Sequence, residues 1–194
     1  MSEIAKLLNF DLFKSKLRQI DKDELHILLC GGESIKPVLK SLFESSRKAS
    51  FLINIYLSDE RLVQLDSSDS NYFQISALME EIGFDNYNIN QFNESFFESV
   101  EEDFFDFCFL SLAKDGHYAG LVDMKISDEM IISNLKINND NFSRKTLNFP
   151  FFNKLNNTYL IVKGSDRLQN YEKLKNQNDN IVKRLEIKNL LYIE

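Results

Sequence analysis

Short apolar runs, separated by segments of helical character, constrain the fold of this chain more than any other feature. Such runs occur at Leu25–Cys30, Phe51–Leu57 and Asp106–Leu112, and helices are expected between them at about 37–47 and 71–83. Strands that are apolar throughout are typical of parallel sheets, because helices cover both faces. The pattern therefore predicts an α/β fold with a three-layer, Rossmann-like, mostly parallel sheet.

Both ends of the chain fit this alternation. Apolar residues recur at helical spacing within residues 1–20, so we expect an amphipathic helix there, and no signal peptide is recognisable. An acidic helix is expected over 94–103. A strand at 158–164, a helix over about 166–175 and a last strand ending at Glu194 complete the predicted order.

Length and charge limit the classes of function. The 194 residues suit a single domain spanning 1–194. The formal net charge of −7 argues against a nucleic-acid partner, which would require a basic surface. No apolar run is long enough to cross a bilayer. We therefore expect a cytoplasmic protein with neither nucleic acid nor membrane as partner.

Cysteines and histidines are too few for a metal site. Cys30 and Cys108 lie in apolar runs and are expected to be buried, reduced thiols. The only histidines are His26 and His117, and no CxxC or HxxxH spacing occurs. His26 begins an apolar strand and is interpreted as structural.

Three loops rich in small or polar residues follow the predicted core strands. Ligands of parallel sheets bind beyond the carboxyl ends of the strands. In the first loop, CGGES, Gly31 and Gly32 allow backbone N–H groups to approach an anion, and Ser34 adds a hydroxyl donor. A tight strand-to-helix turn explains the same residues equally well.

The second and third loops contain side chains suited to anion binding and proton transfer. In LSDER, Arg61 offers the planar fork that binds phosphate, although a solvated charge cluster has the same composition. In LAKDGH, Asp115 and Gly116 indicate a turn, and the next residue, His117, is of a type suited to accepting a proton from water, because histidine has a reference pKa of about 6.5. Asp115 can orient its ring. A solvent-facing turn histidine is the alternative.

Two further arginines, Arg144 and Arg167, lie on separate predicted elements and can approach a phosphate from different sides. Each alone is more typical of a surface charge. The sequence contains no GxSxG, GxxxxGK[ST] or GxGxxG motif, so a serine nucleophile and nucleotide binding lack their usual signatures.

Taken in order, these segments resemble the 6-phosphogluconolactonases, which form a larger group with the glucosamine-6-phosphate deaminases. LSDERLVQLDSSDSNYFQ resembles the family's DER loop followed by D-SN-Y, and FDFCFLSLAKDGHYAGL resembles its DGH segment. LLCGGESIKP is similar to LSGGSTP. Weaker similarities are RKTL at 144–147 and IVKGSDR at 161–167. The similar segments follow the family order along the chain.

The resemblance implies a NagB/RpiA-like fold and hydrolysis of 6-phosphoglucono-1,5-lactone to 6-phosphogluconate in the oxidative pentose phosphate pathway. It implies that His117 is the general base that activates water, and that Arg61, Arg144 and Arg167 hold the phosphate. The other residues it assigns are Asp115 in catalysis and Gly31, Gly32, Ser34, Asp59, Asn71 and Gly116 in substrate binding. The expected partner is a small-molecule sugar phosphate, bound by a monomer or homodimer without metal or organic cofactor.

Several positions differ from the family pattern. Glu33 and Ile35 replace the serine and proline of GGSTP, and Ser111 and Ala113 replace two glycines before DGH. These differences motivate an alternative, a non-catalytic sugar-phosphate-binding module on the same fold. An amino-sugar-phosphate deaminase is a further alternative, but the carboxylate expected after DGH for that chemistry has no counterpart here.

Overall fold

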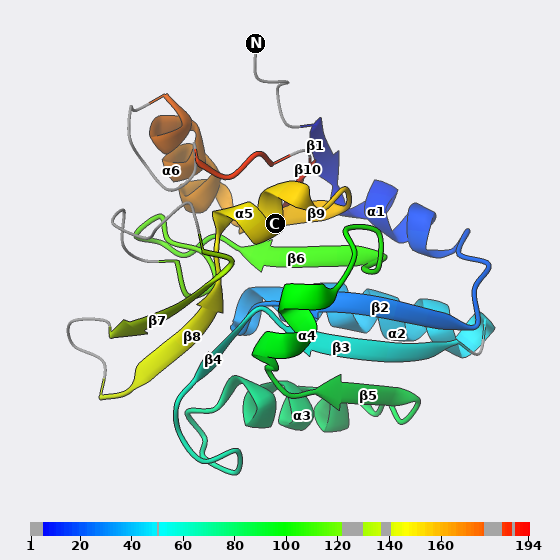
Figure 1. Ribbon diagram of the computed structural model, residues 1–194. Coiled ribbons are helices and arrows are strands. Elements are labelled where there is room, and N and C mark those ends of the chain that lie inside the picture. The colour runs from blue at the N-terminus through cyan, green and yellow to red at the C-terminus, as the bar shows by residue number, and fades with distance from the viewer. Residues whose placement is uncertain (1–5, 50, 122–129, 137–140, 177–183, 188) are drawn as a thin grey trace.

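A seven-stranded sheet, called the large sheet below, forms the centre of the protein (Figure 1). Its strands lie in the order β1 (Lys6–Asn9), β10 (Asn189–Ile193), β9 (Thr158–Lys163), β6 (Phe107–Ser111), β2 (Glu24–Leu29), β3 (Leu52–Leu57) and β5 (Tyr87–Asn90). Every neighbouring pair is parallel. The computed structural model describes residues 6–49, 51–121, 130–136, 141–176, 184–187 and 189–194. The predicted α/β class and mostly parallel sheet are confirmed.

A second sheet, called the small sheet, is antiparallel. It consists of β4 (Asp59–Arg61), β8 (Ser143–Leu147) and β7 (Ile132–Lys136), in that order. The small sheet lies beside the ends toward which the arrows of β3 and β6 point (Figure 1). It therefore adds a wall to the edge at which a parallel sheet binds its ligands.

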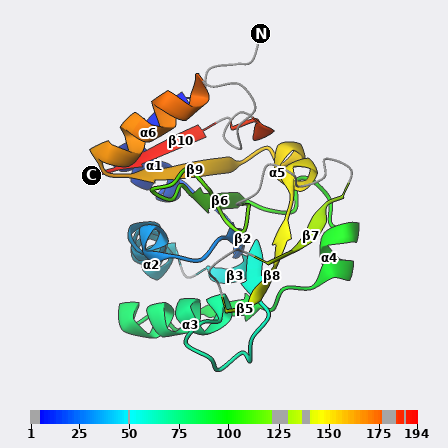
Figure 2. The same ribbon diagram turned by 90° about the vertical axis from the view of Figure 1, so that its left-hand side faces the viewer.

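Helices cover both faces of the large sheet. They are α1 (Phe10–Leu17), α2 (Lys36–Ala49), which follows a 3₁₀ turn at Glu33–Ile35, α3 (Asn71–Ile82), α4 (Glu94–Ser99), α5 (Phe149–Lys154) and α6 (Ser165–Lys175). Figure 2 shows α2 and α3 on one side of the strands and α4 and α5 on the other. The three layers predicted from the sequence are present.

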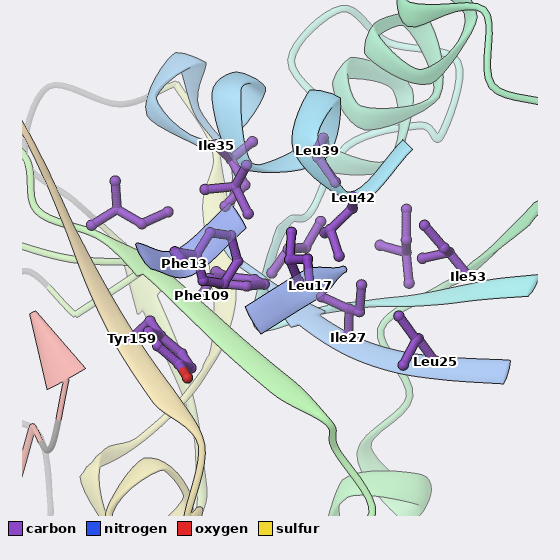
Figure 3. Packing of buried hydrophobic residues seen from close by; sticks show 14 of the residues in the cluster. Phe13, Leu17, Leu25, Ile27, Ile35, Leu39, Leu42, Ile53, Phe109 and Tyr159 are labelled. Carbon is purple, nitrogen blue, oxygen red and sulfur yellow. The ribbon is translucent and has the colours of Figure 1, made fainter. Parts of the chain in front are cut away.

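Side chains of the core strands alternate between two apolar cores. On β2, Leu25, Ile27 and Leu29 face the core under α1 and α2, whereas Leu28 belongs to the opposite core. Figure 3 shows the first core, with Phe13 of α1 beside the strands. Successive strand residues point to opposite faces, so burial on both faces requires the unbroken apolar runs seen in the sequence.

The prediction of one helix over residues 1–20 was wrong. Residues 6–9 form strand β1, and the helix is confined to 10–17. Asn9 separates the two elements, because its side-chain oxygen accepts the N–H of Leu12 at 2.9 Å and caps the helix. Pairing of β1 with β10 holds the preceding residues extended, and local spacing contains no sign of that distant partner. Residues 1–5 lie outside the described part of the chain.

Other elements were shorter than predicted or were not predicted. The helix expected over 94–103 ends at Ser99. Strand β5 has the sequence YNIN, which contains no apolar run, and α5 is only six residues long. The DER segment, expected to be part of a loop, is strand β4. Short elements with polar or mixed composition thus lack a recognisable period.

The remaining structural predictions concern sulfur, His26 and membranes. Cys30 and Cys108 are buried and free, as expected. The ring of His26 packs 4.4 Å from that of Phe104, centroid to centroid. In the described ranges, His, Cys, Asp and Glu side chains form no group of three that could hold a metal ion. None of the helices there has the length and apolar character needed to span a membrane.

Candidate active site

The strand order places a crevice at the carboxyl edge of the large sheet. From β2 the chain moves outward to β3 and then β5, and it returns to β6 on the other side of β2. The loops that follow β2 and β6 therefore lead in opposite directions. Such a switch point leaves a crevice between the loops, where parallel sheets bind ligands.

A pocket of about 390 Å³ lies in this crevice. Its size is within the range of small-molecule sites, roughly 300–1,000 Å³. The predicted site residues that line it are Gly31, Gly32, Ser34, Asp59, Arg61, Asn71, His117, Arg144 and Arg167. The structure thus brings together residues from the loops after β2 and β6, from β4 and β8 of the small sheet, and from α3 and α6.

The first loop passes very close to the start of α3. A Cβ atom at Gly31 would lie 2.5 Å from Oδ1 of Asn71, so a side chain cannot be placed there without displacing the amide. Asn71 is buried, and its Nδ2 donates to the backbone oxygen of Asp59 at 2.9 Å and to Asp59 Oδ2 at 3.1 Å. Gly31 thus permits the contact that joins the first and second loops.

The three residues of the DER segment, which form strand β4, have two different roles. Asp59 and Arg61 line the pocket, two positions apart as the pleat requires. Glu60 lies between them, and its carboxylate accepts the N–H groups of Asn71 at 2.7 Å and Tyr72 at 2.8 Å. These are the first backbone donors of α3, so Glu60 stabilises the helix start and fixes its position relative to β4.

Several features of the site act on the ionisation of the Asp59 carboxyl group in opposite directions. Burial raises the pKa of its carboxyl group above the usual value, and this effect outweighs the positive charge of Arg144 and the hydrogen bond from Asn71, which lower it. The pocket therefore contains a carboxyl group that ionises less readily than an exposed aspartate does.

Arg61 and Arg144 are cross-strand neighbours in the small sheet. Nη1 of Arg61 donates to the backbone oxygen of Asp69 at 2.7 Å. Its Nε is buried and has no acceptor among the described residues. A buried N–H without an acceptor is costly, so an incoming acceptor would be favoured here.

Arg167 reaches the pocket from the first turn of α6. Its Nη1 donates to the hydroxyl oxygen of the buried Ser34 at 2.7 Å. The bond connects α6 to the loop after β2, and it orients the Ser34 hydroxyl group by using one of its lone pairs.

The DGH loop is closed by its own backbone. Gly116 N–H donates to Ala113 O at 3.1 Å, and Ala113 N–H donates to His117 O at 2.8 Å. Nδ1 of His117 lies 2.6 Å from Oδ1 of Asp115. An ionised carboxylate only accepts, so in the neutral imidazole the proton is on Nδ1 and the lone pair is on Nε2. Asp115 and Gly116 do not line the pocket, and Gly116 abuts Leu174 of α6.

Five pocket-lining residues were not assigned from the sequence: Gln74, Ser111, Leu112, Ala113 and Ala119. Gln74 lies one helical turn after Asn71, so the spacing on α3 offered a signal. Ser111 and Ala113 occupy the positions at which the family has glycines, and that difference marked them as residues that add side chains near the site.

The amino-acid sequence matches a known family. The profile described as Glucosamine-6-phosphate isomerases/6-phosphogluconolactonase matches residues 4–183. The chain belongs to this family. The resemblance inferred from the motifs is confirmed by a match that covers nearly the whole chain.

Individual members of the glucosamine-6-phosphate isomerase/6-phosphogluconolactonase family are similar in sequence and fold. A 6-phosphogluconolactonase of Thermotoga maritima is 26% identical over 162 residues, which span 76% of this chain and 73% of that protein. A crystal structure of 6-phosphogluconolactonase from that organism superposes with a TM-score of 0.72 at 21% identity, covering 97% of both chains. A monomeric glucosamine-6-phosphate deaminase reaches 0.71 at 13% identity, covering 96% of this chain and 95% of its own. The fold is therefore shared by both branches.

Proposed function

We propose that this protein hydrolyses 6-phosphoglucono-1,5-lactone to 6-phosphogluconate, with His117 as the general base. One observation carries the proposal: a histidine bonded to a carboxylate lines the same pocket as three arginines. The name of the Thermotoga maritima relative supports the same activity. Because that relative and a deaminase share the fold, the argument depends on the chemistry of the pocket.

The arginines are suited to the phosphate group. Arg61 and Arg144 come from adjacent strands of the small sheet, and Arg167 comes from α6. Guanidinium groups form paired, charge-assisted hydrogen bonds with phosphate oxygens. The overall charge of −7 does not oppose this, because the pocket itself concentrates positive side chains.

The histidine is suited to activating water. Asp115 fixes the Nδ1–H tautomer of His117, so Nε2 can accept a proton from water as the water oxygen attacks the lactone carbonyl carbon. The bond from that carbon to the ring oxygen then breaks, and the proton passes from His117 to the ring oxygen, which becomes a hydroxyl group. No redox step or group transfer is involved, so water is the only co-reactant.

The test is hydrolysis of freshly prepared 6-phosphoglucono-1,5-lactone, coupled to 6-phosphogluconate dehydrogenase and corrected for spontaneous ring opening. We expect the wild type to accelerate hydrolysis. His117→Ala should lower kcat by about 10²- to 10⁴-fold, which is the usual contribution of a general base. His26→Gln is the matched control, because His26 packs on Phe104 and does not line the pocket.

Two outcomes would contradict the proposal. A folded wild type that gives no acceleration, yet binds 6-phosphogluconate, would favour the non-catalytic binding module. Release of ammonia from glucosamine 6-phosphate, without lactone hydrolysis, would favour the deaminase branch. Unchanged kcat in His117→Ala would remove only the role of His117.

A further inference from the structure

The ring of Phe142 contacts both arginines of the small sheet. Phe142 directly precedes β8, and its ring centroid lies 5.1 Å from the guanidinium carbon of Arg61 and 5.3 Å from that of Arg144. Both distances are within the roughly 6 Å limit of cation–π contacts. Phe142 itself is half-buried and does not line the pocket.

The positive charges of the two arginines repel each other, and the attraction of both to the ring offsets part of this repulsion. Arg61 and Arg144 are directly opposite in the antiparallel pairing of β4 with β8, and the N–H of Leu62 donates to Ser143 O at 2.8 Å just beyond them. Like charges at directly opposite positions repel. The backbone pairing nevertheless fixes their Cα atoms as neighbours, so only the side chains can adjust.

An aromatic ring and a carboxylate could each hold the two guanidinium groups together, but they would affect anion binding differently. A carboxylate between the arginines would accept their hydrogen bonds and cancel their charge, so the pair would bind anions less well. A ring face attracts a guanidinium through its quadrupole and accepts no strong hydrogen bond. Contact with Phe142 therefore orients the two groups without cancelling their charge and without using their N–H donors.

We propose that Phe142 is a positioning residue that holds Arg61 and Arg144 together as one binding unit for the phosphate group of the substrate. This inference rests on the proposed function, because it assigns a support to the same anion-binding wall. The residue acts only through the arginines. Its removal should therefore weaken binding of phosphorylated ligands and leave the chemistry at His117 intact.

The test compares Phe142→Leu, which keeps an apolar side chain, with Phe142→Tyr, which keeps the ring. The probes are 6-phosphogluconate, measured by calorimetry, and the lactone, measured by hydrolysis. We expect Phe142→Leu to weaken 6-phosphogluconate binding and raise KM by about five- to thirtyfold with kcat unchanged, and Phe142→Tyr to restore both. The control is Phe92→Leu, because Phe92 is also half-buried but packs on Phe97, and we expect it to bind normally.

The outcomes distinguish failure of the role of Phe142 from failure of the proposed function. If the wild type binds 6-phosphogluconate and hydrolyses the lactone, equal binding by Phe142→Leu overturns the role of Phe142 alone. Equal losses in Phe142→Leu and Phe142→Tyr would also overturn it, because the ring would not be what matters. If the folded wild type neither binds 6-phosphogluconate nor hydrolyses the lactone, the proposed function fails and the inference fails with it.

Discussion

The large and small sheets differ in how they are buried and in what they contribute to the pocket. Strand β9 of the large sheet has five of its six side chains buried, whereas β8 of the small sheet has two of five. The large sheet contributes to the pocket through Ser111 at the end of β6 and through the loops after β2 and β6. The small sheet contributes side chains directly from its strands, Asp59 and Arg61 on β4 and Arg144 on β8.

Stability and the charge that binds a ligand are therefore supplied mainly by different parts of the molecule. Apolar strands covered by helices stabilise the fold, and the loops at their ends are free to carry glycines and the DGH turn. Strand β8 of the small sheet can carry charged side chains because burial there is incomplete, whereas the buried acids of β4, Asp59 and Glu60, are held by hydrogen bonds. Substitutions in the large sheet should therefore mainly change the free energy of unfolding, and substitutions in the small sheet should mainly change ligand binding.

The largest effect on stability is expected in the large sheet. Phe109 of β6 is fully buried and meets the ring of Phe13 edge to face, with centroids 5.5 Å apart. Phe109→Ala should lower the free energy of unfolding by about 3–5 kcal/mol, measured by urea denaturation. Asn134→Ala, at an exposed position of β7, should change it by less than about 0.5 kcal/mol. Similar losses at both positions would remove the distinction between the sheets.

The next effect is on substrate binding and belongs to the small sheet. Arg61→Ala should raise KM for the lactone by about ten- to a hundredfold while kcat stays near the wild-type value, because hydrogen bonds to charged groups contribute about 1.5–3 kcal/mol. Arg61→Lys should recover part of the loss, since it keeps the charge but not the fork. Steady-state kinetics would measure both.

The control for Arg61 is a cation on the same sheet. Lys145 of β8 is paired with Glu94 and does not line the pocket, so Lys145→Ala should leave KM unchanged. A fall in kcat as large as the rise in KM for Arg61→Ala would show that this arginine acts on the transition state, and the separation between binding wall and catalytic loop would then be wrong.

The smallest effect concerns Asp59, at the boundary where β3 passes into β4. Burial raises the pKa of its carboxyl group, so its protonated form favours the folded state. This contribution is complete below the unfolded-state pKa of about 3.9 and is lost as pH rises through the folded-state value. The stability of the wild type relative to Asp59→Asn should therefore fall as the pH rises above about 4.

Urea midpoints at matched pH would measure this change. Asp85→Asn, at an exposed position, is the control for loss of one negative charge. If the difference in stability between the wild type and Asp59→Asn does not change with pH, burial does not raise the pKa of the Asp59 carboxyl group.

The sequence predicts the large sheet better than the small one, for physical reasons. Apolar runs at β2, β3 and β6 are the direct consequence of burial on both faces, so they were recognisable without a partner. The small sheet brings together residues 59–61 and 143–147, and the decisive pairing of Arg61 with Arg144 is non-local. Local periodicity contains no information about such pairings, which is also why β1 was mistaken for part of a helix.

For the site, motif order predicted which residues would meet but not how they are held. The glycine pair, the DER segment and the DGH turn were expected at one edge, and each contributes at least one residue to the same pocket. The helix-capping role of Glu60 and the contacts of Phe142 were not predicted, because each depends on side-chain direction across elements far apart in sequence. The single domain spanning 1–194, the cytoplasmic location and the monomeric or dimeric state stay predictions.

The pairing of β1 with β10 limits when the edge of the large sheet can form during synthesis on the ribosome. Residues 6–9 emerge before the other described strands, but the strand beside them in the sheet is residues 189–193. At roughly 5–20 residues per second, synthesis of the intervening chain takes on the order of 10–40 s. Until residues 189–193 have emerged, β1 lacks the strand with which it pairs, so its backbone N–H and C=O groups bond to water instead.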